Sequence, residues 1–113
     1  MTTTARCLVE TKYAENAETT QYTAAAGTRV IIDKFTITPP TGAASSLLIH
    51  VVPSGGAAGV SNAIMQAKTM TSTDPTYTCP EMVGRVLEPG DFISTLASAA
   101  TSLVIRIEGR VIN

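Results

Sequence analysis

The chain has a single histidine, His50, which is the first residue to examine for chemistry. A metal centre in a β-sandwich needs several histidine and carboxylate ligands, because each ligand fills one coordination position. One histidine cannot supply such a set, and His50 lies inside an apolar run between Ile49 and Val51. We therefore expect no metal and no cofactor, and we interpret His50 as a structural or interface residue.

The two cysteines, Cys7 and Cys79, are the next candidates, because a thiol can act as a nucleophile when a base lies beside it. Neither belongs to a CxxC pair and neither has a basic residue close in sequence, although Glu81 follows Cys79 closely. They read as reduced, half-buried residues of a protein assembled in the cytoplasm, and a disulfide between them stays open.

The remaining patterns do not indicate catalysis either. The glycine-rich run Gly55–Gly59 lacks the following Lys-Ser/Thr of a phosphate-binding loop. Nine acidic residues are present, but no spacing selects a pair suited to glycoside hydrolysis. We therefore expect no catalytic residues and a protein that is not an enzyme.

Composition bounds the class of protein. The 113 residues suit one domain spanning residues 1–113, and only 15% are charged, against about 25% in typical globular chains. Either much of the surface is buried in an oligomer, or threonine and serine hydroxyls keep it soluble. The chain has no run of Lys and Arg, no apolar stretch long enough to span a membrane and no visible signal peptide. Direct binding of nucleic acid and insertion in a membrane are not expected.

The elements that position His50 and the two cysteines are short runs rich in Val, Ile and Thr, separated by Gly and Pro. This pattern predicts an all-β, single-domain jelly-roll sandwich of about eight antiparallel strands, without a long helix. The expected strands are Ala5–Lys12, Glu18–Ala24, Thr28–Thr38, Ser46–Val52, Ser61–Met70, Thr76–Cys79, Asp91–Leu96 and Thr101–Ile112. The fifth also fits one helical turn, although a strand is favoured, and Met82–Leu87 is expected to form a helical turn.

Several local features follow from the same pattern. In the third strand Ile31, Phe35 and Ile37 share one face that Asp33 interrupts, so a bulge is expected near Asp33 and Lys34. Glu88–Asp91 has Pro and Gly where a type II turn needs them, and Gly109 is expected to mark another bulge. The predicted core consists of Phe35, Leu47, Ile49, Val51, Phe92, Leu103, Ile105 and Ile107.

Several segments also look familiar as a set. They are Pro53-Ser54-Gly55-Gly56, Ser61-Asn62-Ala63-Ile64, Tyr77-Thr78-Cys79-Pro80-Glu81, Val86 to Ile93 and Leu103 to Gly109. Together they resemble small virion proteins of tailed bacteriophages, from about Tyr22 to the end of the chain. The resemblance implies a jelly roll that decorates and cements a capsid, or one that forms part of a tail or fibre. It carries no catalytic residues.

We therefore expect a structural protein on the outer capsid surface, bridging neighbouring copies of the major capsid protein. Symmetry favours a homotrimer on three-fold positions, with a homodimer on two-fold positions as the other choice. Residues 1–4 could form a flexible arm, so the candidate capsid contacts are Met1, Thr2, Thr3, Thr4, Ser54, Gly55 and Gly56. The alternatives are a tail- or neck-fibre component that binds a host receptor or glycan, and a stand-alone sugar-binding module. A fibre protein normally has a separate shaft, which favours the capsid role.

Overall fold

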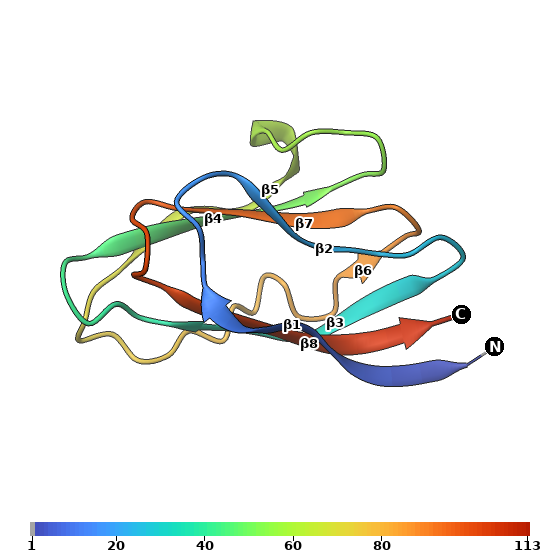
Figure 1. Cartoon of the computed structure of the whole chain (residues 1–113), viewed down its shortest axis with the longest axis horizontal. Coiled ribbons are helices and arrows are strands. Elements are labelled where there is room, and N and C mark those ends of the chain that lie inside the picture. The colour runs from blue at the N-terminus through green and yellow to red at the C-terminus, as the bar shows by residue number, and fades with distance from the viewer. Residues whose placement is uncertain (1) are drawn as a thin grey trace.

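A computed structural model of the chain describes residues 2–113, which form two four-stranded antiparallel sheets packed as a sandwich (Figure 1). The eight strands are β1 (Thr3–Tyr13), β2 (Thr19–Thr23), β3 (Arg29–Thr38), β4 (Ser45–Val52), β5 (Ala63–Met70), β6 (Val86–Leu87), β7 (Phe92–Ala97) and β8 (Val104–Ile112). A short 3₁₀ helix, η1 (Val60–Asn62), precedes β5. The expected all-β class is confirmed, and so is the strand favoured for the ambiguous segment ending at Met70.

The connectivity is that of a jelly roll. The first sheet has the strand order β1-β8-β3-β6 and the second sheet has the order β2-β7-β4-β5. Successive strands from β1 to β4 thus alternate between the two sheets rather than meandering within one sheet, as in a jelly roll. The first strand and the last are neighbours, and Thr2 and Asn113 exchange two backbone hydrogen bonds of 2.8 and 3.0 Å.

The core lies between the sheets. Six of the eight expected core residues are fully buried there, namely Phe35, Leu47, Ile49, Leu103, Ile105 and Ile107. The other two were misplaced. Val51 is only partly buried against the core, and Phe92 is partly exposed opposite Val52, because the alternation of β7 turns Ile93, rather than Phe92, towards the core.

The bulge expected near Asp33 and Lys34 is confirmed, since the pairing of β3 with β8 shifts between Ile32 and Lys34. A bulge moves the alternation of a strand by one residue. The residues before it that face the core are therefore Val30 and Ile32, and Ile31 is only half-buried. Placing Ile31 on the face of Phe35 was wrong for that reason.

The segment between β5 and β6 departs most from expectation. Thr76–Cys79 is not a strand, because it forms only an isolated bridge in which Tyr77 exchanges backbone hydrogen bonds with Ile37. Pro75 and Pro80 flank it, and Cys79 has a positive φ of 45°, which lies outside the extended region of regular strands. The helical turn expected over Met82–Leu87 was wrong as well, since its last two residues form β6 against β3.

Two further expectations change. Thr3 and Thr4 pair with Ile112 and Val111, so they belong to β1 instead of a flexible arm, while Met1 lies outside the described residues. Gly109 does not mark a bulge of its own strand; the bulge lies opposite it, in β3. Gly109 is needed there because a Cβ atom would come within 2.3 Å of the Ile31 carbonyl oxygen.

In residues 2–113, no helix is long and apolar enough to cross a membrane.

Candidate functional site

The expected contact residues gather at one end of the sandwich, which we call the loop end. It consists of Thr2 and Asn113, the turn around Gly27, the loop of residues 53–59 and the Glu88–Asp91 turn (Figure 1). Thr2–Thr4 lie at its first-sheet margin, while Ser54, Gly55 and Gly56 lie at its second-sheet margin. All of these residues are exposed, so the described part of the predicted contact set is accessible on one end.

Asp91 fixes this end. Its carboxylate accepts hydrogen bonds from the backbone N–H groups of Ser54 and Glu88, each 3.0 Å long, so it joins the loop to the turn. The type II turn expected at Glu88–Asp91 is confirmed by the Asp91 N to Glu88 O hydrogen bond of 2.9 Å and by the positive φ of Gly90, 88°. The loop is therefore held in one position by its neighbours.

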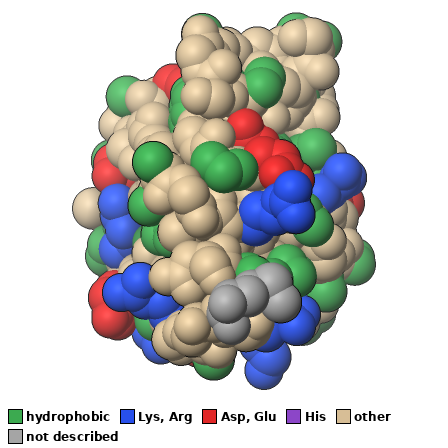
Figure 2. All heavy atoms as spheres, turned by 90° about the vertical axis from the view of Figure 1, so that its right-hand side faces the viewer, with side chains coloured by type: hydrophobic (Ala, Val, Ile, Leu, Met, Phe, Trp, Pro, Cys, Tyr) green, Lys and Arg blue, Asp and Glu red, His purple; other side chains and the backbone are tan. Residues whose placement is uncertain are grey.

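The surface of the loop end is mostly uncharged. In Figure 2, which views this end directly, backbone and polar uncharged side chains cover most of the area, with acidic and basic groups in small patches. Among the described residues one ion pair lies here, between Arg29 Nε and Glu88 Oε1 at 2.8 Å, and both side chains are more than half exposed. Exposed pairs of this kind contribute little to stability, about 0–1 kcal/mol. Such a surface suits contact with another protein better than binding of a small charged ligand.

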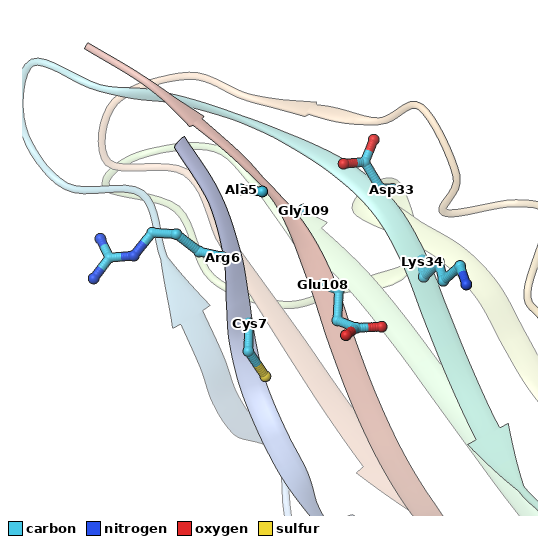
Figure 3. A pocket seen from close by; sticks show the side chains of 7 residues that line it. All are labelled: Ala5, Arg6, Cys7, Asp33, Lys34, Glu108 and Gly109. Carbon is cyan, nitrogen blue, oxygen red and sulfur yellow. The ribbon is translucent and has the colours of Figure 1, made fainter. Parts of the chain in front are cut away.

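The outer face of the first sheet is charged by contrast. Arg110 binds the Asp33 carboxylate through Nε and Nη2 at 3.0 to 3.2 Å, and Arg106 lies 3.4 Å from Glu108 and 3.5 Å from Glu10. A hollow of about 420 Å³ opens here above Gly109 (Figure 3); it is lined by Ala5, Arg6, Cys7, Asp33, Lys34, Glu108 and Gly109. Asp33 and Glu108 already face arginines, so the hollow offers no unpaired acid pair for general acid–base chemistry.

His50 belongs to a polar cluster on the outer face of the second sheet. It pairs with Ser94 across β4 and β7, and its Nδ1 lies 3.3 Å from Glu18 Oε2. Ser94 Oγ donates to the same carboxylate oxygen at 2.5 Å. Glu18 therefore lies between the serine and the histidine, whose buried Nδ1 makes no hydrogen bond to the described residues, whereas a nucleophilic triad needs the histidine in the middle.

Burial also argues against catalysis by this cluster, because His50 is 4% exposed and Ser94 is 2% exposed. A substrate could not reach Ser94 Oγ without moving Glu18. The cluster instead docks the segment before β2 onto the second sheet, which agrees with the structural role expected for His50. The sequence could not show it, since Glu18 and Ser94 are far apart in the chain and only the strand pairing brings them together.

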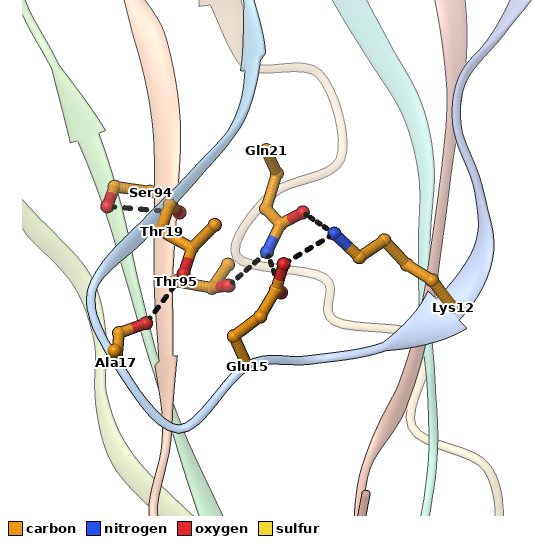
Figure 4. A network of polar contacts seen from close by, with 7 residues as sticks. All are labelled: Lys12, Glu15, Ala17, Thr19, Gln21, Ser94 and Thr95. Carbon is orange, nitrogen blue, oxygen red and sulfur yellow. Dashed lines mark hydrogen bonds and ion pairs between the residues drawn. The ribbon is translucent and has the colours of Figure 1, made fainter. Parts of the chain in front are cut away.

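A second polar network closes the side of the sandwich between β1 and β2 (Figure 4). Lys12 Nζ donates to Glu15 Oε2 at 2.8 Å and to Gln21 Oε1 at 3.0 Å. Gln21 Nε2 donates to Glu15 Oε1 and to the buried Thr95 Oγ1, each at 2.9 Å. The hydrogen bond from Lys12 lowers the pKa of Glu15. The network satisfies polar groups where the sheets separate, which is a structural role.

Both cysteines are free, and they differ in burial. Cys7 is exposed on β1, and Cys79 is buried, where burial and the nearby Glu81 carboxylate raise its pKa to about 12. The expectation that both are half-buried was therefore wrong, and they do not pair. Across residues 2–113, no three His, Cys, Asp or Glu side chains gather as they would around a metal ion.

Comparison with known proteins supports the fold. No known family model matches the chain, and no curated protein matches it either. One solved structure that does match is described as the structure of infectious bursal disease virus, Gx strain. The match has a TM-score of 0.50 at 10% sequence identity, and it covers 97% of this chain and 31% of the viral one. The chain therefore spans about a third of the protein it resembles, and the likeness is one of fold.

Proposed function

We propose that this chain is a non-enzymatic structural protein of a bacteriophage virion, which decorates the outer capsid surface and bridges neighbouring copies of the major capsid protein. The observation that supports this most is the alignment of nearly the whole chain with part of a chain in a virus structure. The segments that resemble small phage virion proteins, such as Val86 to Ile93, point in the same direction.

The polar clusters agree with a structural role. In one cluster Ser94 binds Glu18 beside His50, and in the other Lys12 and Gln21 bind Glu15; both lie where segments distant in the sequence meet. If these clusters are structural, the function of the chain depends on the surfaces that it presents to other proteins. An interface of standard size buries about 1,600 Å² in total, which a sandwich of this size can provide on one side.

The loop between β4 and β5, residues 53–62, is our candidate for contact with the capsid. It projects from the second sheet (Figure 1), and Val60, the first residue of η1 near the end of the loop, is 83% exposed, the most exposed of the large hydrophobic side chains described. Burying this apolar side chain against a partner would be favourable, because apolar surface gains free energy when it is removed from water. Asp91 fixes the start of the loop at Ser54 and thereby limits the entropy lost on docking.

The test is to count and then perturb this chain in virions of the phage that encodes it. Quantitative mass spectrometry should find it in a fixed ratio to the major capsid protein, in hundreds of copies per particle. Particles stripped of the protein and incubated with the purified Val60→Asp variant should recover far less of it than with wild type. The matched control is Val86→Asp, which changes a half-exposed valine of the first sheet and should bind normally.

Circular dichroism should show that both variants fold like wild type, because both side chains are exposed. A dozen copies or fewer, located on the tail or neck, would overturn the capsid role in favour of a fibre component. Equal occupancy by the Val60→Asp variant would overturn the proposed contact.

A further inference from the structure

The first half of β1 is an open sheet edge. Thr3 to Cys7 pair one-for-one with Ile112 to Glu108 on one side, and the strand order places no described strand on the other side. All five residues are exposed, although an ordinary strand of a sandwich buries one of its two faces. This half of β1 therefore lies beyond the cover of the second sheet (Figure 1).

The other edges are protected in the ways that usually prevent strand addition. The second half of β1 has shifts of register after Cys7 and after Val9. β2 has one after Thr20, and β5 has two shifts and a residue with positive φ, Ala67. The edge of β3 beyond the two-residue β6 is occupied by Tyr77, which bonds to Ile37. Thr3–Cys7 is thus the longest regular stretch of free edge among the described strands.

The hydrogen-bond pattern identifies the groups that this edge presents. Thr2 and Asn113 exchange both backbone bonds, and in an antiparallel ladder such pairs alternate with pairs that exchange none. Thr4 and Arg6 therefore bond to β8, while the N–H and C=O groups of Thr3, Ala5 and Cys7 point to the open side. These groups are what an added strand would bind.

We propose that this edge pairs with the same edge of a second copy, antiparallel and across a two-fold axis at Ala5. In this register Ala5 faces the partner's Ala5, and Thr3 faces the partner's Cys7, so every outward-pointing residue finds a bonding partner. Arg6, the one charged side chain of the segment, faces the partner's Thr4. The two four-stranded first sheets then join into one continuous sheet.

Other registers are worse for reasons visible in the sequence. An axis at Arg6 would place two guanidinium groups directly opposite each other, and like charges in that position are destabilising. An axis at Cys7 would run the pairing into the shift of register between Cys7 and Val9. The axis at Ala5 also brings two small side chains together, so no steric obstacle lies at the centre.

This inference is independent of the proposed function, because the pairing concerns the purified chain alone. Analytical ultracentrifugation of the wild-type protein should show a reversible dimer, and Ala5→Pro should convert it into a folded monomer. Proline removes only the N–H that points to the open side, and edge strands tolerate proline there. The control Thr4→Ser, on the bonded side of the strand, should dimerise like wild type.

Cross-linking tests the register even if Ala5→Pro fails to fold. Residues that exchange both bonds have Cα atoms about 5.5 Å apart, which is within the range of a disulfide. In a Cys7→Ser background, Ala5→Cys should form a disulfide-linked dimer on mild oxidation, whereas Thr4→Cys should form several-fold less. A monomeric wild-type protein, a dimer unaffected by Ala5→Pro, or equal cross-linking at both positions would each overturn the proposal.

Discussion

At the scale of single residues, the two thiols differ most sharply. Cys7 is exposed on the edge strand, whereas Cys79 is fully buried and its pKa is raised to about 12. The thiolate is the nucleophile, so a buried thiol that stays protonated at pH 8 reacts slowly.

We predict that an alkylating reagent such as iodoacetamide modifies one cysteine per native chain at pH 8 and two in denaturant. Mass spectrometry of the modified peptides should assign the native adduct to Cys7. Chains that carry Cys7→Ser provide the control, since they should take up no reagent until unfolded. Rapid native labelling of Cys79 would contradict the burial described here.

Single residues also differ in how well their burial could be predicted from the sequence. Leu103, Ile105 and Ile107 were placed correctly because an uninterrupted alternation assigns them to one face. Phe92 was misplaced because β7 carries Ser94 and Thr95 side by side, both buried, so hydrophobicity alone does not reveal its phase. The partners of His50 were out of reach, since no local signal connects it to Glu18.

At the scale of the elements, the contact of β8 with β3 depends on one glycine. A Cβ atom on Gly109 would lie 2.3 Å from the Ile31 carbonyl oxygen and 3.1 Å from Leu8 Cδ1. The first of these is a backbone atom, so β3 or β8 would have to move.

We predict that Gly109→Ala lowers the free energy of unfolding by about 1–3 kcal/mol, the usual cost of forcing extra volume into a packed site. Urea denaturation followed by circular dichroism would measure it. Gly42→Ala is the matched control, because a Cβ there meets nothing within 4 Å and φ is not positive, and it should change stability by less than about 0.5 kcal/mol. A loss for Gly109→Ala as small as that for Gly42→Ala would show that the β8–β3 contact can adapt.

Most elements could be predicted from the sequence because alternation and turn signals are strong where strands are long. The β3 bulge was visible as Asp33 interrupting an apolar face, and the Glu88–Asp91 turn was visible from Pro89 and Gly90. The segment between β5 and β6 was not, because its conformation depends on backbone bonds from Tyr77 and Gly84 to β3. Long-range bonds of this kind leave no local pattern.

At the scale of the whole molecule, charge is distributed unequally. The outer face of the first sheet carries Glu10, Asp33, Lys34, Arg106, Glu108 and Arg110, while the outward residues of β4 and β7 include Leu48, Leu96 and Phe92. The low overall charge of the chain therefore reflects one charge-poor side, which suits a protein that docks with that side and exposes the other.

If the chain does cement a capsid, its binding must stabilise the particle by mass action. A ligand that binds only the intact state contributes roughly 2.7 kcal/mol per site at a concentration about 100 times Kd. We predict that stripped particles release DNA at a lower temperature than decorated ones, measured by dye fluorescence on heating. Adding back wild-type protein should restore the temperature, and adding back the Val60→Asp variant should not. Equal release temperatures for stripped and decorated particles would contradict a cementing role.

The pairing of Thr2 with Asn113 has a mechanical consequence. Because β1 and β8 run antiparallel and begin and end side by side, a force that pulls these two residues apart acts across the ladder and loads one rung at a time. The ladder would open like a zipper at low force, starting at Thr3 and Ile112. A protein under tension in a particle would therefore resist unfolding best when the force acts on its loops or sheet faces. It would resist unfolding least when the force acts on residues 2 and 113.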